Sequence, residues 1–83
     1  MLETLLLQGK NENTLLPRVL RIMAQQGKQI ETLNCEVQKN RQLINIEITL
    51  QDKGDLELTA KLLQRLVGVE AVAREKVKQA RAM

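Results

Sequence analysis

The chain has 83 residues, of which 43% are apolar, a net charge of +3, and no His, Phe, Tyr or Trp. This length allows one domain with a small core of aliphatic side chains, so association with another subunit would add useful stability. Without His the chain lacks the commonest general base and metal ligand, and without aromatic side chains it has no platform on which bases could stack.

The sequence carries no pattern that would direct it to a membrane or out of the cell. The N-terminal stretch MLETLLLQGKNEN contains Glu3 and lacks the long apolar run of a signal peptide. No segment approaches the roughly 20 apolar residues of a membrane span. The single Cys35 cannot form an internal disulfide. We therefore expect a cytoplasmic protein that binds neither membranes nor nucleic acid.

The chain begins with a strand and a helix joined by a polar loop. Neighbouring apolar residues predict a central strand over Met1 to Gly9. Apolar residues at helical spacing predict a helix over Thr14 to Gln26, with Thr14 as N-cap and Gly27 as the terminating residue. The polar loop 10–13 then lies at a helix N-terminus, where free N–H groups favour an anion such as a carboxylate.

Two strands follow as an antiparallel hairpin around residues 39–41. Alternation predicts the first over Gln29 to Gln38, with Cys35 packed on its apolar face. Ile30 is at an even-numbered position, whereas the other apolar residues of this strand are at odd-numbered positions. In a regular strand Ile30 would point to the opposite face, which predicts a bulge near Glu31. The second strand, Gln42 to Leu50, has the clearest alternation in the chain.

A second helix and a last strand complete the chain. Asp55 is the expected N-cap of a helix that Gly68 closes, and Val69 to Arg74 is the last strand. The remaining charged, Ala-rich segment is either a frayed helix or disordered. We therefore divide the chain into one domain, 1–75, and a charged C-terminal tail, 76–83.

The order strand-helix-strand-strand-helix-strand predicts an α+β fold of the ferredoxin-like βαββαβ type. Right-handed crossovers give a four-stranded antiparallel sheet of order 4-1-3-2 with both helices on one face. The carboxylates are scattered among strand residues, and there is no Cys pair or Gly-rich phosphate loop. We therefore expect no catalytic residue and no metal site, so that the chain alone is not an enzyme.

The sequence resembles the ACT domain of the regulatory small subunit of acetolactate synthase (acetohydroxyacid synthase), most of all its short isozyme II type. The match runs from about residue 2 to residue 74. It is carried by an ordered series of residues, listed here in chain order: Asn11-Glu12, Leu16, Arg18-Val19, Gln25, Gly27, Ile30-Glu31, Leu33, Ile44 to Leu50, Leu66 to Val69, and Val72-Ala73.

This resemblance implies a non-catalytic subunit that activates and stabilises the large catalytic subunit in branched-chain amino-acid biosynthesis. It implies no cofactor in this chain, because thiamine diphosphate, magnesium and FAD belong to the catalytic partner. It also implies a homodimer through the edges of strand 2, which would cover an otherwise open edge.

The resemblance further implies an amino-acid site at the dimer interface, for valine or another branched-chain amino acid. The implied residues are Asn11, Asn13, Thr14, Leu15, Gln29 and Ile30. The family's Gly near the helix start is Thr14 here, which hinders close approach of a ligand to the backbone. The family's Asn before Ile is Gln29 here, whose longer side chain displaces the amide. We therefore expect a vestigial site with weak or no valine feedback.

Two alternatives remain open at this point. Asn11 and Asn13 could simply cap the helix. The chain could also be a freestanding ACT-type amino-acid sensor that regulates another enzyme or a transporter.

Overall fold

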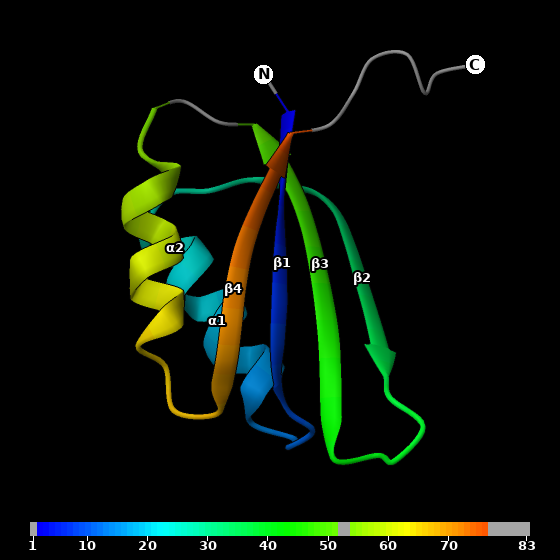
Figure 1. The fold of residues 1–83 in the computed structure, drawn as a ribbon. Coiled ribbons are helices and arrows are strands. Elements are labelled where there is room, and N and C mark those ends of the chain that lie inside the picture. The colour runs from blue at the N-terminus through cyan, green and yellow to red at the C-terminus, as the bar shows by residue number, and fades with distance from the viewer. Residues whose placement is uncertain (1, 52–53, 77–83) are drawn as a thin grey trace, which may run out of the picture.

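The computed structural model describes residues 2–51 and 54–76 of the chain. These residues form six elements in the predicted order (Figure 1): β1 (Leu2–Lys10), α1 (Leu15–Gln25), β2 (Ile30–Val37), β3 (Leu43–Gln51), α2 (Leu56–Gln64) and β4 (Val69–Lys76). No helix within these residues is long and apolar enough to cross a membrane.

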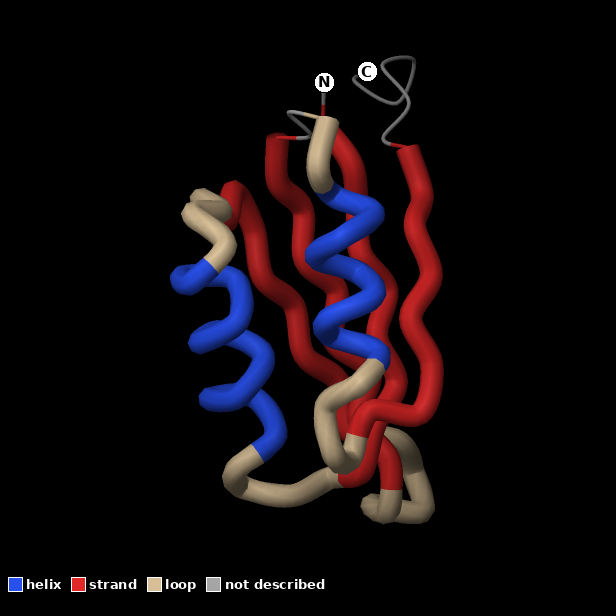
Figure 2. Tube along the Cα trace, turned by 90° about the vertical axis from the view of Figure 1, so that its left-hand side faces the viewer, coloured by secondary structure: helices blue, strands red, loops and turns tan. Residues whose placement is uncertain are grey.

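The four strands form one antiparallel sheet in the order β2-β3-β1-β4, which confirms the predicted order 4-1-3-2. β1 is central: Leu5 pairs with Ile48 of β3 on one side and with Arg74 of β4 on the other. Both helices lie on the same side of this sheet (Figure 2).

The core lies between the helices and the sheet and contains no aromatic side chain. The strands contribute alternate residues, and the helices contribute one face each. Its buried members are Leu5, Leu7, Leu15, Val19, Met23, Ile46, Ile48, Leu50, Leu56 and Leu63. Burying one such aliphatic side chain contributes about 1.5–3 kcal/mol, so this small set carries most of the hydrophobic stability.

One polar residue is fully buried among these apolar side chains. Thr59 of α2 is 0% exposed, and its hydroxyl has no hydrogen-bond partner among the described residues. Thr59→Val should therefore raise the free energy of unfolding by about 1 kcal/mol, because it removes an unsatisfied hydroxyl and keeps the β-branched shape.

The matched control for Thr59 is Thr4→Val, measured by the same urea titration. Thr4 lies in β1, and its hydroxyl shares a hydrogen bond of 3.0 Å with that of Thr49. Losing this partnered hydroxyl should lower stability. A stabilising Thr4→Val, or a destabilising Thr59→Val, would contradict this account.

The packing predicted for Cys35 is wrong. Cys35 lies on the predicted face, opposite Ile46, but its side chain is exposed. Its neighbours Leu33 and Val37 are each 40% exposed. The reason is that β2 is the edge strand of the sheet, and its residues from Glu31 to Val37 are all exposed. The alternation of apolar and polar residues therefore predicted which face of the strand these side chains lie on, but not whether they are buried.

The predicted bulge in β2 is confirmed. Ile30 pairs with Leu50 and Thr32 pairs with Thr49, so Glu31 is the extra residue. The bulge turns Ile30 toward the core while the strand keeps its alternation afterwards.

The start and end of α1 match the prediction, although the predicted side-chain cap does not form. Thr14 is the N-cap residue, but its side chain makes no capping hydrogen bond. At the other end Gly27 adopts φ 70°, Gly27 N–H donates to Ala24 O at 3.0 Å, and Lys28 N–H donates to Met23 O at 2.9 Å. This pair of bonds is the Schellman motif, which requires a residue in the left-handed region.

The second half of the chain differs from prediction at three points. Asp55 is the N-cap residue of α2, as predicted, but its side chain forms an ion pair with Lys28 and makes no capping hydrogen bond. α2 ends at Gln64, and residues 65–68 form a turn in which Gly68 adopts φ 98°. β4 continues to Lys76, so the first residue assigned to the tail belongs to the sheet; residues 77–83 lie outside the described part.

Candidate ligand-binding site

The end of β1 packs tightly against the turn that precedes β4. A Cβ atom on Gly9 would lie 2.7 Å from Gly68 O and 2.7 Å from Leu15 Cδ2. Lys10 N–H donates to Gly68 O at 2.8 Å. The absence of a side chain at Gly9 therefore allows the end of β1 and this turn to meet.

Asn11 joins the loop between β1 and α1 to the β2–β3 hairpin. Its backbone N–H donates to Gln42 O at 3.0 Å, and its side-chain Nδ2 donates to Arg41 O at 3.0 Å. Arg41 adopts φ 61°, a conformation uncommon outside Gly. The side-chain amide of Asn11 thus supports the turn at Arg41, and the alternative in which Asn11 caps α1 is wrong.

The start of α1 offers fewer free donors than a typical anion-binding helix. Leu15 N–H donates to Glu12 O at 3.1 Å, and Pro17, in the first turn, has no N–H. Asn13 and Thr14 are exposed, whereas the side chain of Leu15 is buried in the core. Leu15 is therefore placed by packing, whereas Asn13 and Thr14 present their side chains at the surface.

The loop borders an open groove of about 450 Å³ that contains charges of both signs. Lys10 and Arg41 provide cations, and Glu12 and Glu70 provide carboxylates. Such an arrangement can hold a zwitterion by pairing both of its ends. Sequence reasoning missed Arg41 and Glu70 as members of this groove.

Glu70 could have been found from the pattern of β1, the strand that pairs with β4. Val69 pairs with Gly9 and Ala71 pairs with Gln8, so Glu70 is an extra residue at an irregularity. The signal in the sequence is the Gly at position 9 in an otherwise apolar strand, because Gly in a strand interior marks a bulge or close approach. Arg41 left no comparable signal.

The other half of the predicted site lies at the opposite end of α1. Gln29 is exposed, and Ile30 is partly buried against the core. Eleven helical residues separate them from the Asn11 loop, about 16 Å at the usual rise. One chain therefore does not bring Gln29 and Ile30 together with Asn11, Asn13 and Thr14. Whether a second chain does so stays a prediction.

A small cavity of about 110 Å³ lies beside Gln29, at the C-terminal end of α1. Lys28 reaches across it to Asp55, and the Lys28 side chain is only 6% exposed. The cation lies near the negative end of α1 and the carboxylate near the positive end of α2, which both helix dipoles favour. This pair fastens the two helices to each other and fills a structural role.

Among the described residues, no group of His, Cys, Asp or Glu is arranged to hold a metal ion. The exposed carboxylates near the groove also have no nucleophile or base beside them of the kind that acyl or phosphoryl transfer requires. The arrangement can bind a small polar ligand, and we assign it no reaction.

Several solved structures share this fold. The ACT domain from GTP pyrophosphokinase of Chlorobium tepidum is 14% identical, with a TM-score of 0.74 over 89% of this chain and 96% of that domain. An uncharacterised protein from Thermotoga maritima is also 14% identical, with a TM-score of 0.72 over 93% and 96%. A homoserine dehydrogenase from Thiobacillus denitrificans is 19% identical with a TM-score of 0.72, but the match covers only 17% of it.

These likenesses show the fold, and none of the three proteins is an acetolactate synthase subunit. No curated protein sequence matches the chain. The family profile described as "ACT domain" matches residues 3–74, which spans every element described above. ACT domains are generally regulatory modules that bind small ligands. The chain therefore belongs to the ACT domain family.

Proposed function

We propose that this ACT domain is a non-catalytic regulatory subunit that activates and stabilises the acetolactate synthase catalytic subunit in the cytoplasm. The support for this partner is the ordered series of residues that resembles the short isozyme II type, above all Ile44 to Leu50 and Leu66 to Val69. Thiamine diphosphate, magnesium and FAD belong to the catalytic subunit in this proposal.

We propose further that valine feedback is weak or absent. The observation that carries this is the engagement of the loop's own donors: the side-chain amide of Asn11 binds Arg41, and Leu15 N–H binds Glu12. A carboxylate arriving at this loop would have to displace contacts that hold the fold together. Thr14 and Gln29, in place of the family's Gly and Asn, act in the same direction.

The proposed homodimer forms along β2. This edge strand is exposed from Glu31 to Val37, and an exposed edge strand offers unpaired N–H and C=O groups to a second strand. Pairing two copies there would bring the Gln29–Ile30 turn of one protomer toward the Asn11 loop of its partner, as the resemblance implies.

The direct test is acetolactate formation by the matching catalytic subunit, with and without this chain and with valine titrated in. The proposal expects strong activation that valine does not reverse. Activation that valine reverses would overturn the vestigial site, and no activation would overturn the partner.

Restoring the family residues tests the site itself. Thr14→Gly combined with Gln29→Asn should tighten valine binding roughly 10- to 30-fold, since two regained hydrogen bonds contribute about 1 kcal/mol each. Isothermal titration calorimetry measures this change. Gln64→Asn, at the exposed end of α2, shortens an amide outside the site and should leave binding unchanged. Unchanged affinity in the double variant would count against this account.

A second function is favoured by the charged groove. Lys10 and Arg41 face the same groove as Glu12 and Glu70, and this combination suits a free amino acid. A freestanding sensor would bind an amino acid tightly there without affecting acetolactate synthase. Arg41→Gln would abolish that binding, as measured by isothermal titration calorimetry with free amino acids.

A further inference from the structure

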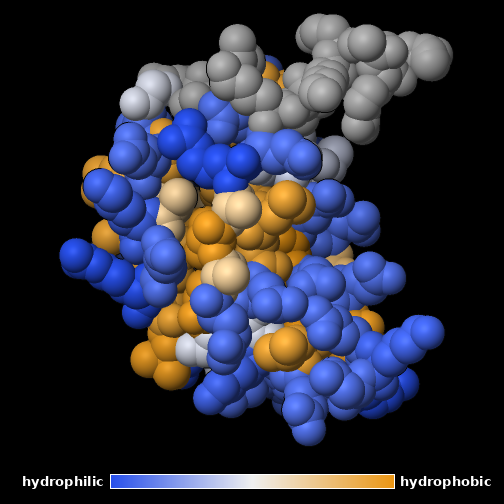
Figure 3. Space-filling model, viewed as in Figure 1, coloured by the Kyte–Doolittle hydropathy of each residue, from blue (hydrophilic) through white to orange (hydrophobic). Residues whose placement is uncertain are grey.

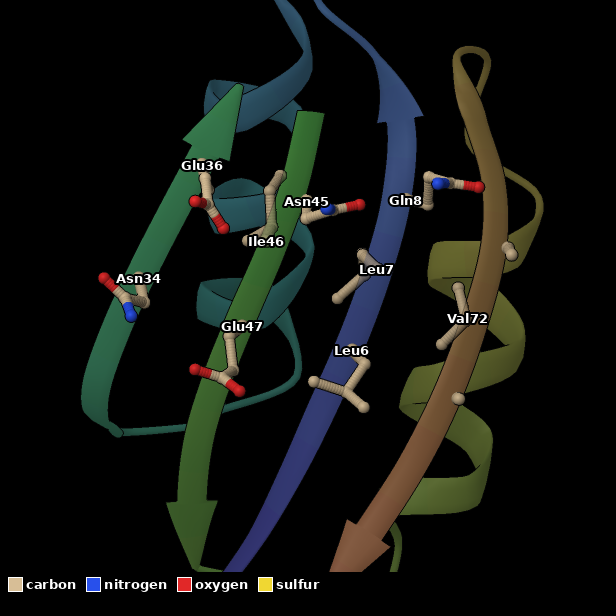
Figure 4. A pocket seen from close by; sticks show the side chains of 11 residues that line it. Leu6, Leu7, Gln8, Asn34, Glu36, Asn45, Ile46, Glu47 and Val72 are labelled. Atoms are coloured by element: carbon tan, nitrogen blue, oxygen red, sulfur yellow. The ribbon is translucent and has the colours of Figure 1, made fainter. Parts of the chain in front are cut away.

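The face of the sheet turned away from the helices is open and hollowed. A depression of about 380 Å³ lies over all four strands (Figure 4). Each strand contributes residues to its lining, among them Leu6, Asn34, Glu36, Glu47, Ala71 and Ala73.

The centre of this depression is apolar. Leu6 of β1 pairs with Glu47 on one side and with Ala73 on the other, so the three side chains share the open face. Ala71 and Ala73 are exposed and small, which leaves room for an incoming side chain above β4. Figure 3 shows the result as a hydrophobic patch enclosed by hydrophilic residues.

The surroundings of this patch are acidic. Glu36 and Glu47 line the depression on the β2–β3 side, and Glu75 shares the face because it pairs with Thr4. None of the described residues that line the depression is Lys or Arg, although the chain as a whole has a net charge of +3. The lining of the depression therefore has the opposite sign to the chain.

This charge distribution decides among the possible occupants. A second copy that docked face to face would bring two sets of carboxylates together, which costs free energy. Nucleic acid and anionic lipid are repelled for the same reason. A basic protein surface would bind favourably, because its cations pair with the carboxylates and its apolar part covers the apolar centre.

We propose that this open face docks a partner protein through an apolar side chain surrounded by Lys and Arg. We assign that basic surface to the catalytic subunit, and this assignment rests on the proposed function. Four strands of eight or nine residues give a face of about 500–600 Å² at the usual strand spacing and rise. A standard interface buries about 800 Å² per partner, so this face supplies most of one side. The edge of β2 stays free for a second copy.

The first experiment does not depend on the identity of the partner. The probe is a 15-residue helical peptide of Lys, Leu and Ala, and the control is the same peptide with Glu in place of Lys. In nuclear magnetic resonance spectra of the labelled chain, the basic peptide should shift the amide signals of Leu6, Glu47 and Ala73. The acidic peptide should not. Shifts confined to the helices or to the Asn11 loop would overturn the docking surface.

The second experiment uses charge reversal and the catalytic subunit. Glu47→Lys should weaken association with both the basic peptide and the catalytic subunit at least about tenfold, measured by sedimentation. Glu57→Lys makes the same change on exposed α2 and should stay within about twofold. Glu36→Lys is the second open-face variant and should act like Glu47→Lys if that variant fails to fold.

The outcomes separate the two proposals. If the wild-type chain does not associate with the catalytic subunit, the proposed partner fails, and the peptide still decides the surface. If the wild-type chain associates but the open-face reversals bind as tightly as Glu57→Lys, the docking surface is overturned and the regulatory function stands.

Discussion

Gly9→Ala is expected to lower the free energy of unfolding by about 3 kcal/mol, the upper end of overpacking costs. The new Cβ would lie 2.7 Å from Gly68 O, a backbone atom, and 2.7 Å from Leu15 Cδ2. To relieve this overlap the end of β1 must separate from the turn before β4, which strains the 2.8 Å hydrogen bond from Lys10 N–H to Gly68 O. Urea titration of the variant measures the loss.

The control for Gly9 is Gly27→Ala. Gly27 adopts φ 70°, and a Cβ atom on it would meet no other part of the chain within 4 Å. Its substitution therefore costs only the left-handed strain, about 1–2 kcal/mol. Gly9→Ala should be the more damaging of the two. An equal or smaller loss at Gly9 would mean that the end of β1 and the turn before β4 are not held in close contact.

Arg74→Leu is expected to cost about 3 kcal/mol, because it leaves a buried carboxylate without its cation. Glu3 in β1 is 3% exposed, and Arg74 in β4 contacts both of its oxygens: Nε donates to Oε1 at 3.1 Å and Nη2 donates to Oε2 at 3.2 Å. Since the Arg74 side chain is 36% exposed, solvent replaces part of the lost interaction and keeps the cost at the lower end of the range for buried pairs.

Two further variants separate the ion pair from simple packing. Glu3→Leu combined with Arg74→Leu should recover most of the stability, because no charge is then left buried. Lys61→Leu removes an exposed cation that lies 3.8 Å from Glu57 and should barely change stability. A double variant as unstable as Arg74→Leu alone would show that the arginine acts by packing.

Local pattern was enough to predict the elements of this fold. The alternation of Ile44, Ile46 and Ile48 identified β3, and the parity of Ile30 identified the bulge at Glu31. Gly27 ended α1 where a left-handed residue was expected. These features depend on residues close in the sequence, and the order of the elements then left few topologies to consider.

The errors came from contacts between distant residues. Cys35 is exposed because it lies on the uncovered edge strand β2. Asp55 is the N-cap residue of α2, but its side chain pairs with Lys28 from the preceding helix–strand turn and makes no capping hydrogen bond. Arg74, at the end of the predicted last strand, is the partner of buried Glu3, a contact that no local pattern indicated.

The candidate site was predicted only in part for the same reason. The loop that contains Asn11, Asn13 and Thr14 does border a groove, but Arg41 and Glu70 reach that groove from other strands. Asn11 and Arg41 are 30 residues apart, so their contact could not be predicted from the pattern of neighbouring residues.

The central position of β1 has a consequence for how the chain acquires its structure during synthesis. β1 leaves the ribosome first, yet its partners are β3 and β4, and Glu3 pairs with Lys76 at the far end of the described chain. Until β3 emerges, the apolar residues of β1 have no strand to pair with. Of the three strand pairs, only β2–β3 joins strands that are neighbours in the sequence. Such long-range closure slows folding and leaves apolar surface exposed to aggregation. The order of synthesis therefore delays closure of the sheet until β3 and β4 have both emerged.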